Sequence, residues 1–194
     1  MRETEAAARQ RLLQQLRTRA AALDLRGLRA RVQAAGAEFE AALAGLDEAA
    51  ARRPGPGGSW SAAQVVDHVA QSTVRGADEL RQLGAGRRPP GPPVYEALLS
   101  GAAHRVPWAE LLDGLRESRG ALDEALAAGP PPPGAGPAAT ARAILVVAAT
   151  PEVPDPEPFT AELTWPEYAL VLRLHFLDHR EQVRRLRAAH AAAS

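Results

Sequence analysis

Two histidines four residues apart, His175 and His179, are the strongest chemical signal in this sequence. On a helix this spacing puts both imidazoles on one face, with Cβ atoms about 5–6 Å apart. Imidazole is a common metal ligand, and Zn–N bonds are about 2.0–2.1 Å long, so two rings on one turn can reach the same ion. The pair also lies in an apolar stripe of the kind that a bundle helix turns towards its core: Tyr168, Val171, Leu172, Val183 and Leu186.

A third ligand has to come from another segment, because helix bundles build metal sites from side chains on facing helices. His68 is the best candidate, since it lies beside the predicted core face of a second helix. Asp67, its neighbour in sequence, is a candidate hydrogen-bond partner for the ligands. Three histidines with an open fourth position are typical of reactive sites rather than closed structural ones. Spacing alone leaves open the alternative that each is an ordinary hydrogen-bonded histidine.

Other catalytic patterns are missing from the sequence. Phe176 follows His175 where a zinc protease of the HExxH type needs a glutamate. The chain has no cysteine, which excludes disulfides, thiolate ligands and a cysteine nucleophile. All 23 basic residues are arginine, which excludes a lysine Schiff base and a P-loop lysine. His104 and His190 fall in a predicted loop and near the C-terminus, and we assign neither a role.

Length and charge restrict the class of protein. The 194 residues suffice for one domain with a substantial core. A formal net charge of zero provides no overall field to attract nucleic acid or an anionic membrane. The N-terminus lacks the apolar segment of a signal peptide, and the longest apolar run is far shorter than the roughly 20 residues that span a bilayer. We therefore expect a soluble cytoplasmic protein without nucleic-acid or membrane partners.

Helical periodicity divides the chain into a short extension and a main domain. Leucines at near-helical spacing predict a basic helical extension over residues 1–23, before a domain at 24–194. Within that domain, apolar residues with a 3.6-residue period predict one amphipathic helix over 24–52, stopped by the Pro- and Gly-rich residues 54–58.

Three further helices follow. The sequence Ser61-Ala62-Ala63-Gln64 is a capping box that begins one, and Thr164-Trp165-Pro166-Glu167 begins the last in the same way. Between them, a leucine stripe after Pro107 predicts a third bundle helix. Two β-branched or apolar runs, 143–149 and 159–163, are candidates for a short strand pair. The fold class is therefore all-α, a four-helix bundle with an extra N-terminal helical segment and a short strand pair in a 140–163 insert.

Two motifs resemble the DinB/YfiT-like superfamily. WSAAQVVDHVAQS, residues 60–72, resembles its second-helix signature, in which a Trp and a cap precede a helix that carries the first metal histidine. LHFLDHREQVRRL, residues 174–186, resembles its last-helix signature, HxxxH followed three residues later by a glutamine, here Gln182. The resemblance covers roughly residues 24–190 in the order of the elements.

This resemblance implies an up-down-down-up bundle and a mononuclear site of three histidines, here His68, His175 and His179. Gln182 would then support the ligands. The expected cofactor is a divalent metal ion (Zn, Ni or Fe), and members of the family are often homodimers. Characterised relatives include mycothiol-dependent isomerases and bacillithiol transferases, in which the metal is taken to activate a low-molecular-weight thiol.

The chain departs from the family in its N-terminal extension and in the long, proline-rich insert at 130–163, which is expected near the mouth of the site. Substrate identity therefore cannot be carried over from relatives. We expect a metal-dependent enzyme with a small-molecule substrate, acting by thiol transfer or isomerisation. Metal-assisted hydrolysis is one alternative, and a non-catalytic metal-binding or stress-related bundle is another.

Overall fold

A computed structural model describes residues 4–93, 98–132, 139–151 and 153–192. These ranges contain, in chain order, α1 (Glu5–Ala21), α2 (Leu25–Leu43), α3 (Glu48–Arg52), the 3₁₀ turn η1 (Pro56–Gly58), α4 (Ala62–Gly84), the 3₁₀ turn η2 (Ala102–His104), α5 (Trp108–Ala128), β1 (Ala141–Leu145), β2 (Phe159–Leu163) and α6 (Trp165–Ala192). No helix in the described part of the chain is long and apolar enough to cross a membrane.

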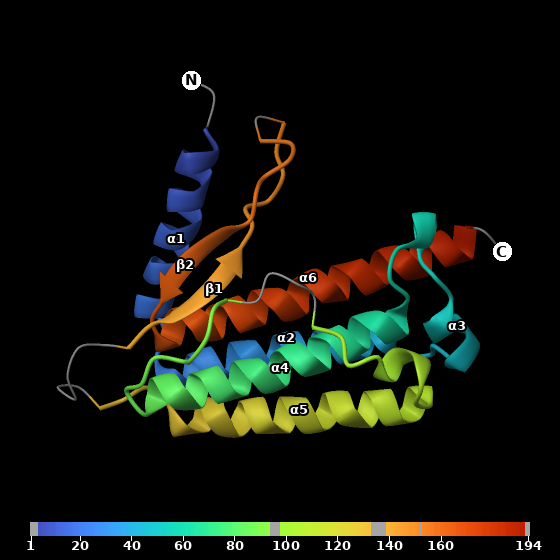
Figure 1. Cartoon of the computed structure of the whole chain (residues 1–194), viewed down its shortest axis with the longest axis horizontal. Coiled ribbons are helices and arrows are strands. Elements are labelled where there is room, and N and C mark those ends of the chain that lie inside the picture. Colours follow the sequence, from blue (N-terminus) through green and yellow to red (C-terminus); the bar gives the residue numbers. More distant parts are fainter. Residues whose placement is uncertain (1–3, 94–97, 133–138, 152, 193–194) are drawn as a thin grey trace.

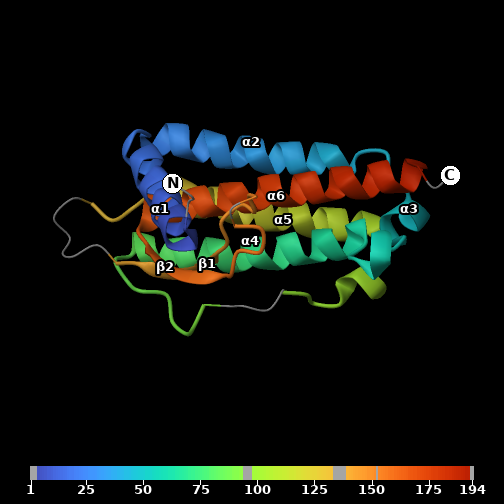
Figure 2. The same ribbon diagram turned by 90° about the horizontal axis from the view of Figure 1, so that it is seen from above.

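Helices α2, α4, α5 and α6 form a four-helix bundle. α2 and α6 run in one direction, and α4 and α5 run in the other (Figure 1 and Figure 2). α4 packs against both α5 and α6, and α2 packs against the same two helices from the other side. The core between them contains fully buried leucine, valine and phenylalanine side chains, among them Phe39, Leu80, Leu115 and Val183. The expected all-α, up-down-down-up bundle is confirmed.

Local sequence sets the start of the two helices that carry the candidate histidines. Ser61 caps α4: its side chain accepts from the Gln64 N–H at 3.3 Å, and the Gln64 side chain accepts from the Ser61 N–H at 3.0 Å. At the start of α6, the Glu167 carboxylate accepts from the Thr164 N–H at 2.8 Å. These caps fix the first turns of α4 and α6, and thus the direction in which later residues point.

The prediction of one helix over residues 24–52 is wrong. α2 ends at Leu43, and Gly45 adopts a φ of +79°, a left-handed conformation that glycine takes without a Cβ penalty. Asp47 then caps the separate helix α3 by accepting from the Ala50 N–H at 2.8 Å. The apolar period continues through this break because Leu46 packs against the same core.

The two segments outside the bundle pack near the start of α6. β1 and β2 form an antiparallel pair in the insert, with Ala141 opposite Leu163 and Leu145 opposite Phe159. The sequence predicted β2 at its observed bounds, whereas β1 lies two residues earlier at its start than expected. α1 rises from the same end of the bundle beside this hairpin (Figure 1), where its Arg9 stacks over the Phe159 ring at 5.1 Å.

Candidate metal centre

Three imidazoles meet between α4 and α6. His68 comes from α4, and His175 and His179 come from successive turns of α6. One ligand atom of each ring lies within 4.8 Å of the others. The ring centroids are 4.5 Å apart for His175 and His179, 4.8 Å for His68 and His179, and 5.0 Å for His68 and His175. The fold thus brings together the three histidines that the sequence singled out.

Hydrogen bonds orient two of the three rings. The Nδ1 of His179 lies 2.7 Å from Oε1 of Gln182, and the Nδ1 of His68 lies 3.1 Å from the carbonyl oxygen of Leu98. A carbonyl oxygen can only accept a hydrogen bond, so each Nδ1 must carry the proton. The lone pair of each neutral ring is then on Nε2, the atom left to bind a metal. Gln182 therefore supports a candidate ligand, in the position that the resemblance implies.

The Nε2 of His175 is buried and has no hydrogen-bond partner. Buried polar atoms are nearly always paired, so an unpaired one calls for an explanation. A cation held between the three rings would give this nitrogen a partner. The three ligand atoms lie within 4.8 Å of one another. Metal–nitrogen bonds are about 2.0–2.1 Å long, so nitrogens bound to one ion must lie closer together than this, and small side-chain rotations can close the difference. On these grounds the donor set fits a divalent metal ion.

The surroundings keep all three imidazoles neutral. Burial lowers the pKa of His175 to about 3, with a further contribution from the nearby His179 and His68. Burial also lowers the pKa of His179 to about 4, although its bond to Gln182 acts in the opposite direction. The pKa of His68 is lowered by burial as well, against the opposing effects of Leu98 and Asp67. Neutral imidazole is the form that binds metal.

Asp67 affects the site through its hydrogen bonds to a neighbouring backbone segment. Its buried carboxylate accepts from the Ser100 hydroxyl at 2.6 Å and from the N–H groups of Ser100 and Gly101 at 3.3 and 3.0 Å. These bonds anchor residues 98–101, and the carbonyl of Leu98 in that segment faces His68. The predicted partner therefore positions the segment that orients the ring.

A cavity of about 180 Å³ adjoins the histidines. His68 and His175 are at one end, and its apolar wall includes Ala143 and Ile144 of β1 and Val171 of α6. The proline-rich insert thus contributes a wall of the cavity next to the candidate ligands. We call this space the histidine cavity.

Sequence reasoning missed a buried polar network in the same cavity. The Tyr168 hydroxyl donates to the Glu79 carboxylate, whose other oxygen accepts from Nε of Arg75 at 2.7 Å. Burial and the charge of Glu79 raise the pKa of Tyr168 well above its usual value, so its hydroxyl keeps the proton. One signal could have revealed this network: Arg75 and Glu79 follow His68 at helical spacing, along one stripe of α4.

The other two histidines lie outside this cluster. His104 is exposed in η2, and Nε2 of His190 lies 3.0 Å from the carbonyl oxygen of Pro54 at the far end of α6. Neither was given a role from the sequence, and neither belongs to the group of ligand atoms.

Comparison with protein families connects this geometry to a known group. The family model described as the DinB superfamily matches residues 31–183, which include all three clustered histidines. Comparison with curated proteins and with solved structures found no match. The matched range covers more than half of the sequence and begins after α1, so the N-terminal helix lies outside it. The chain belongs to the DinB superfamily.

Proposed function

We propose that His68, His175 and His179 hold one divalent metal ion and that the protein is a metal-dependent enzyme acting on a small molecule. The observation that carries this proposal is the buried, unpartnered Nε2 of His175, which faces two rings whose Nδ1 atoms are already bonded. When bound, such an ion supplies Lewis acidity and lowers the pKa of a water or thiol at its open position.

Other residues orient the ligand rings and limit the access of water to the site. Gln182 and the Leu98 carbonyl fix two of the rings, and burial keeps the ligand nitrogens unprotonated. Because the histidine cavity opens beside His68 and His175, a substrate there would lie next to the candidate ligands. The apolar walls contributed by β1 and α6 would restrict water around the substrate.

Thiol transfer or isomerisation is the reaction class that we propose, because the resemblance to thiol-dependent members of this superfamily implies it. Metal-assisted hydrolysis is the chemical alternative. Zinc, nickel or iron as the metal, a low-molecular-weight thiol as cosubstrate, a homodimer and a cytoplasmic location all stay predictions.

Metal analysis tests the first part of the proposal. The purified protein is stripped with a chelator, offered Zn²⁺, Ni²⁺ or Fe²⁺, desalted and measured by elemental analysis. We expect about one ion per chain, as for a mononuclear site, and almost none in His68→Ala and His179→Ala. The exposed His104→Ala is the matched control and should bind as the wild type does. A wild-type chain that takes up none of the three metals would contradict the proposal.

Activity is tested on metal-loaded protein with mycothiol, bacillithiol and glutathione as thiols and with electrophilic acceptors. We expect thiol consumption that requires metal and is lost in His175→Ala. If the protein binds metal but consumes none of the thiols and hydrolyses no test ester, the non-catalytic alternative replaces the enzyme.

A further inference from the structure

The histidine cavity has a distinct end away from the candidate metal ligands. Tyr168 lies seven residues before His175 on α6, which is roughly 10 Å along the helix axis at about 1.5 Å per residue. Arg75 lies seven residues after His68 on the antiparallel helix α4, so it reaches the same level. Arg142 of β1 also lines the cavity. The cavity is therefore long in one direction, with histidines at one end and arginines at the other.

Among the described residues, cations exceed anions at the arginine end. Arg75 is paired with Glu79. Arg142 lies directly opposite Glu162 in the strand pair, but Glu162 is also bonded by Arg88. Of the residues that the structure describes in the cavity lining, Arg75 and Arg142 are cations and Glu79 is the anion, so this part of the lining carries an excess of one positive charge. A divalent ion at the other end would add to this excess, so the cavity favours an anionic ligand.

The two arginines that line the cavity have donors to spare. Nη2 of Arg142 donates to the Gly91 carbonyl at 2.8 Å, and Nη2 of Arg75 lies 3.4 Å from the Pro92 carbonyl. A guanidinium group has five N–H donors in a planar fork that matches a carboxylate. Within the part of the chain that the structure describes, these backbone contacts and the bond from Arg75 to Glu79 use only part of that capacity.

Size and wall chemistry restrict the rest of the ligand. The cavity volume of about 180 Å³ is below the range of about 300–1,000 Å³ common for drug-sized ligands. Between its two ends the cavity is lined by the apolar side chains of Ile144, Val171 and Leu172. A short apolar chain fits this middle part better than a sugar or a nucleotide, which would leave polar groups unpaired.

We infer that the histidine cavity binds a small organic acid. The carboxylate is held by Arg142 and Arg75, a short apolar chain lies along Ile144 and Val171, and the opposite end of the molecule faces His68 and His175. This inference deepens the proposed function and rests on it only for what happens at the histidine end, because the arginine end requires no metal.

Direct binding of simple carboxylates tests the inference. Butyrate and hexanoate are titrated into the protein by NMR at constant ionic strength, once in chelator-treated samples and once with Zn²⁺. Butylamine serves as the ligand of opposite charge. We expect both acids to bind in both samples and Arg142→Gln to weaken binding roughly 10- to 100-fold, the equivalent of one lost charge-assisted hydrogen bond. Arg31→Gln, an exposed change on α2, should have no effect.

A second variant tests the cavity without changing its charge. Ile144→Phe narrows the middle part and should weaken hexanoate more than butyrate. The inference is overturned if butylamine binds as well as butyrate, if Arg142→Gln binds as the wild type does, or if the acids bind only with Zn²⁺. Carboxylate binding that depends on Arg142 in a chain unable to take up Zn²⁺ would contradict the proposed metal site and leave this inference intact.

Discussion

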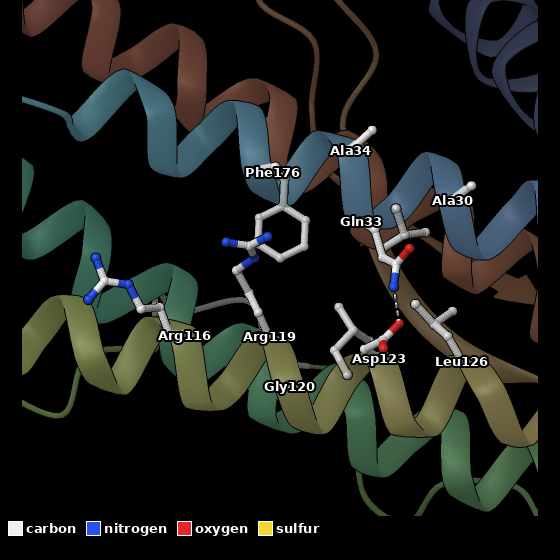
Figure 3. A pocket seen from close by; sticks show the side chains of 12 residues that line it. Ala30, Gln33, Ala34, Arg116, Arg119, Gly120, Asp123, Leu126 and Phe176 are labelled. Atoms are coloured by element: carbon white, nitrogen blue, oxygen red, sulfur yellow. Dashed lines mark hydrogen bonds between the residues drawn. The ribbon is translucent and has the colours of Figure 1, made fainter.

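Two interfaces on opposite sides of the bundle each border a cavity that is open to solvent. The α4–α6 interface contains the histidine cavity, whereas the α2–α5 interface contains a larger one of about 590 Å³ (Figure 3). We call the second space the α2–α5 cavity. Its lining combines small and apolar side chains with the ends of several polar ones: Ala30, Ala34, Leu122, Leu126, Phe176, Gln33, Arg116, Arg119 and Asp123.

The polar groups of the α2–α5 cavity pair with one another. Asp123 accepts from Arg29 at 2.7 and 2.6 Å. It also accepts from Gln33 at 2.5 Å (Figure 3). Arg116 and Arg119 of α5 both donate to Glu40 of α2. Among the described residues, the buried polar atoms without a partner include none from the lining of this cavity. The larger cavity thus shows no buried group that awaits a ligand.

The comparison shows that the larger of these two cavities is not the one with an unpaired buried polar atom. Two consecutive residues illustrate it: His175 lines the histidine cavity with an unpartnered nitrogen, and Phe176 points to the other side, where it lines the α2–α5 cavity. Phe176 is only 2% exposed, and its ring centroid is 6.3 Å from that of Phe39. We therefore assign ligand chemistry to the smaller space and a packing role to the residues that line the larger one.

The largest effects on stability and on metal binding should come from substituting these two neighbours, His175 and Phe176. Phe176→Ala removes a buried ring and should lower the free energy of unfolding by about 3–5 kcal/mol, while the folded protein still binds metal. His175→Ala should abolish metal binding. Denaturant titrations of metal-free protein, with metal uptake measured alongside, check both. Loss of metal in folded Phe176→Ala would show that the two sides are not separate.

The pH dependence of stability should also differ between the two sides. In the folded metal-free protein the pKa values of His175 and His179 are about 3 and about 4, below the 6.5 of the unfolded chain. The unfolded state therefore binds more protons, and stability falls as the pH drops below 6.5. The loss should be on the order of 2 kcal/mol per histidine by pH 5. Asp123, whose pKa is held below 3.8 mainly by Arg29, contributes a loss only at lower pH.

Denaturant titrations at pH 7 and pH 5 measure this difference, with His175→Gln as the control that should remove the part of the pH dependence that comes from His175. Equal stability at the two pH values would show that the histidines are more exposed to water than their positions indicate.

Much of this architecture could be predicted because its signals are local. The capping box at Ser61 and the apolar periods of α4, α5 and α6 depend only on nearby residues, and so does the helical spacing of His175 and His179. The partnership of His68 with that pair was a hypothesis from its place beside a predicted core face, and the family resemblance strengthened it, because no local rule links residues a hundred positions apart. The break at Gly45 was missed because the apolar period continued through it.

The polar network was missed for a different reason. Tyr168 fits an apolar stripe as well as a polar one, since its ring packs in the core while its hydroxyl reaches Glu79. Likewise, Asp67 was expected beside the ligands, but its carboxylate turns to the backbone of residues 100 and 101. Which group a buried polar side chain pairs with depends on segments that approach from elsewhere in the chain.

Two glutamines allow a smaller, matched test. Gln182 holds the ring of His179, and Gln33 makes a comparable bond to Asp123 on the other side. Gln182→Ala should weaken metal binding about 10- to 100-fold, because the ring loses the partner that fixes its orientation. Gln33→Ala should leave metal affinity unchanged. Competition titrations against a metal indicator measure both affinities, and equal effects of the two changes would remove Gln182 from the site.

The smallest effect concerns two helical glycines. A Cβ on Gly76 of α4 would lie 2.6 Å from Cδ2 of the buried Leu172 of α6, whereas a Cβ on Gly120 of α5, beside the α2–α5 cavity, would meet nothing within 4 Å. Alanine gains up to about 1 kcal/mol over glycine in a helix interior, but overpacking costs about 1–3 kcal/mol. Gly120→Ala should therefore raise the denaturation midpoint, and Gly76→Ala should lower it. A gain at both positions would mean that the Leu172 side chain moves aside at no cost, and that this part of the α4–α6 interface is not tightly packed.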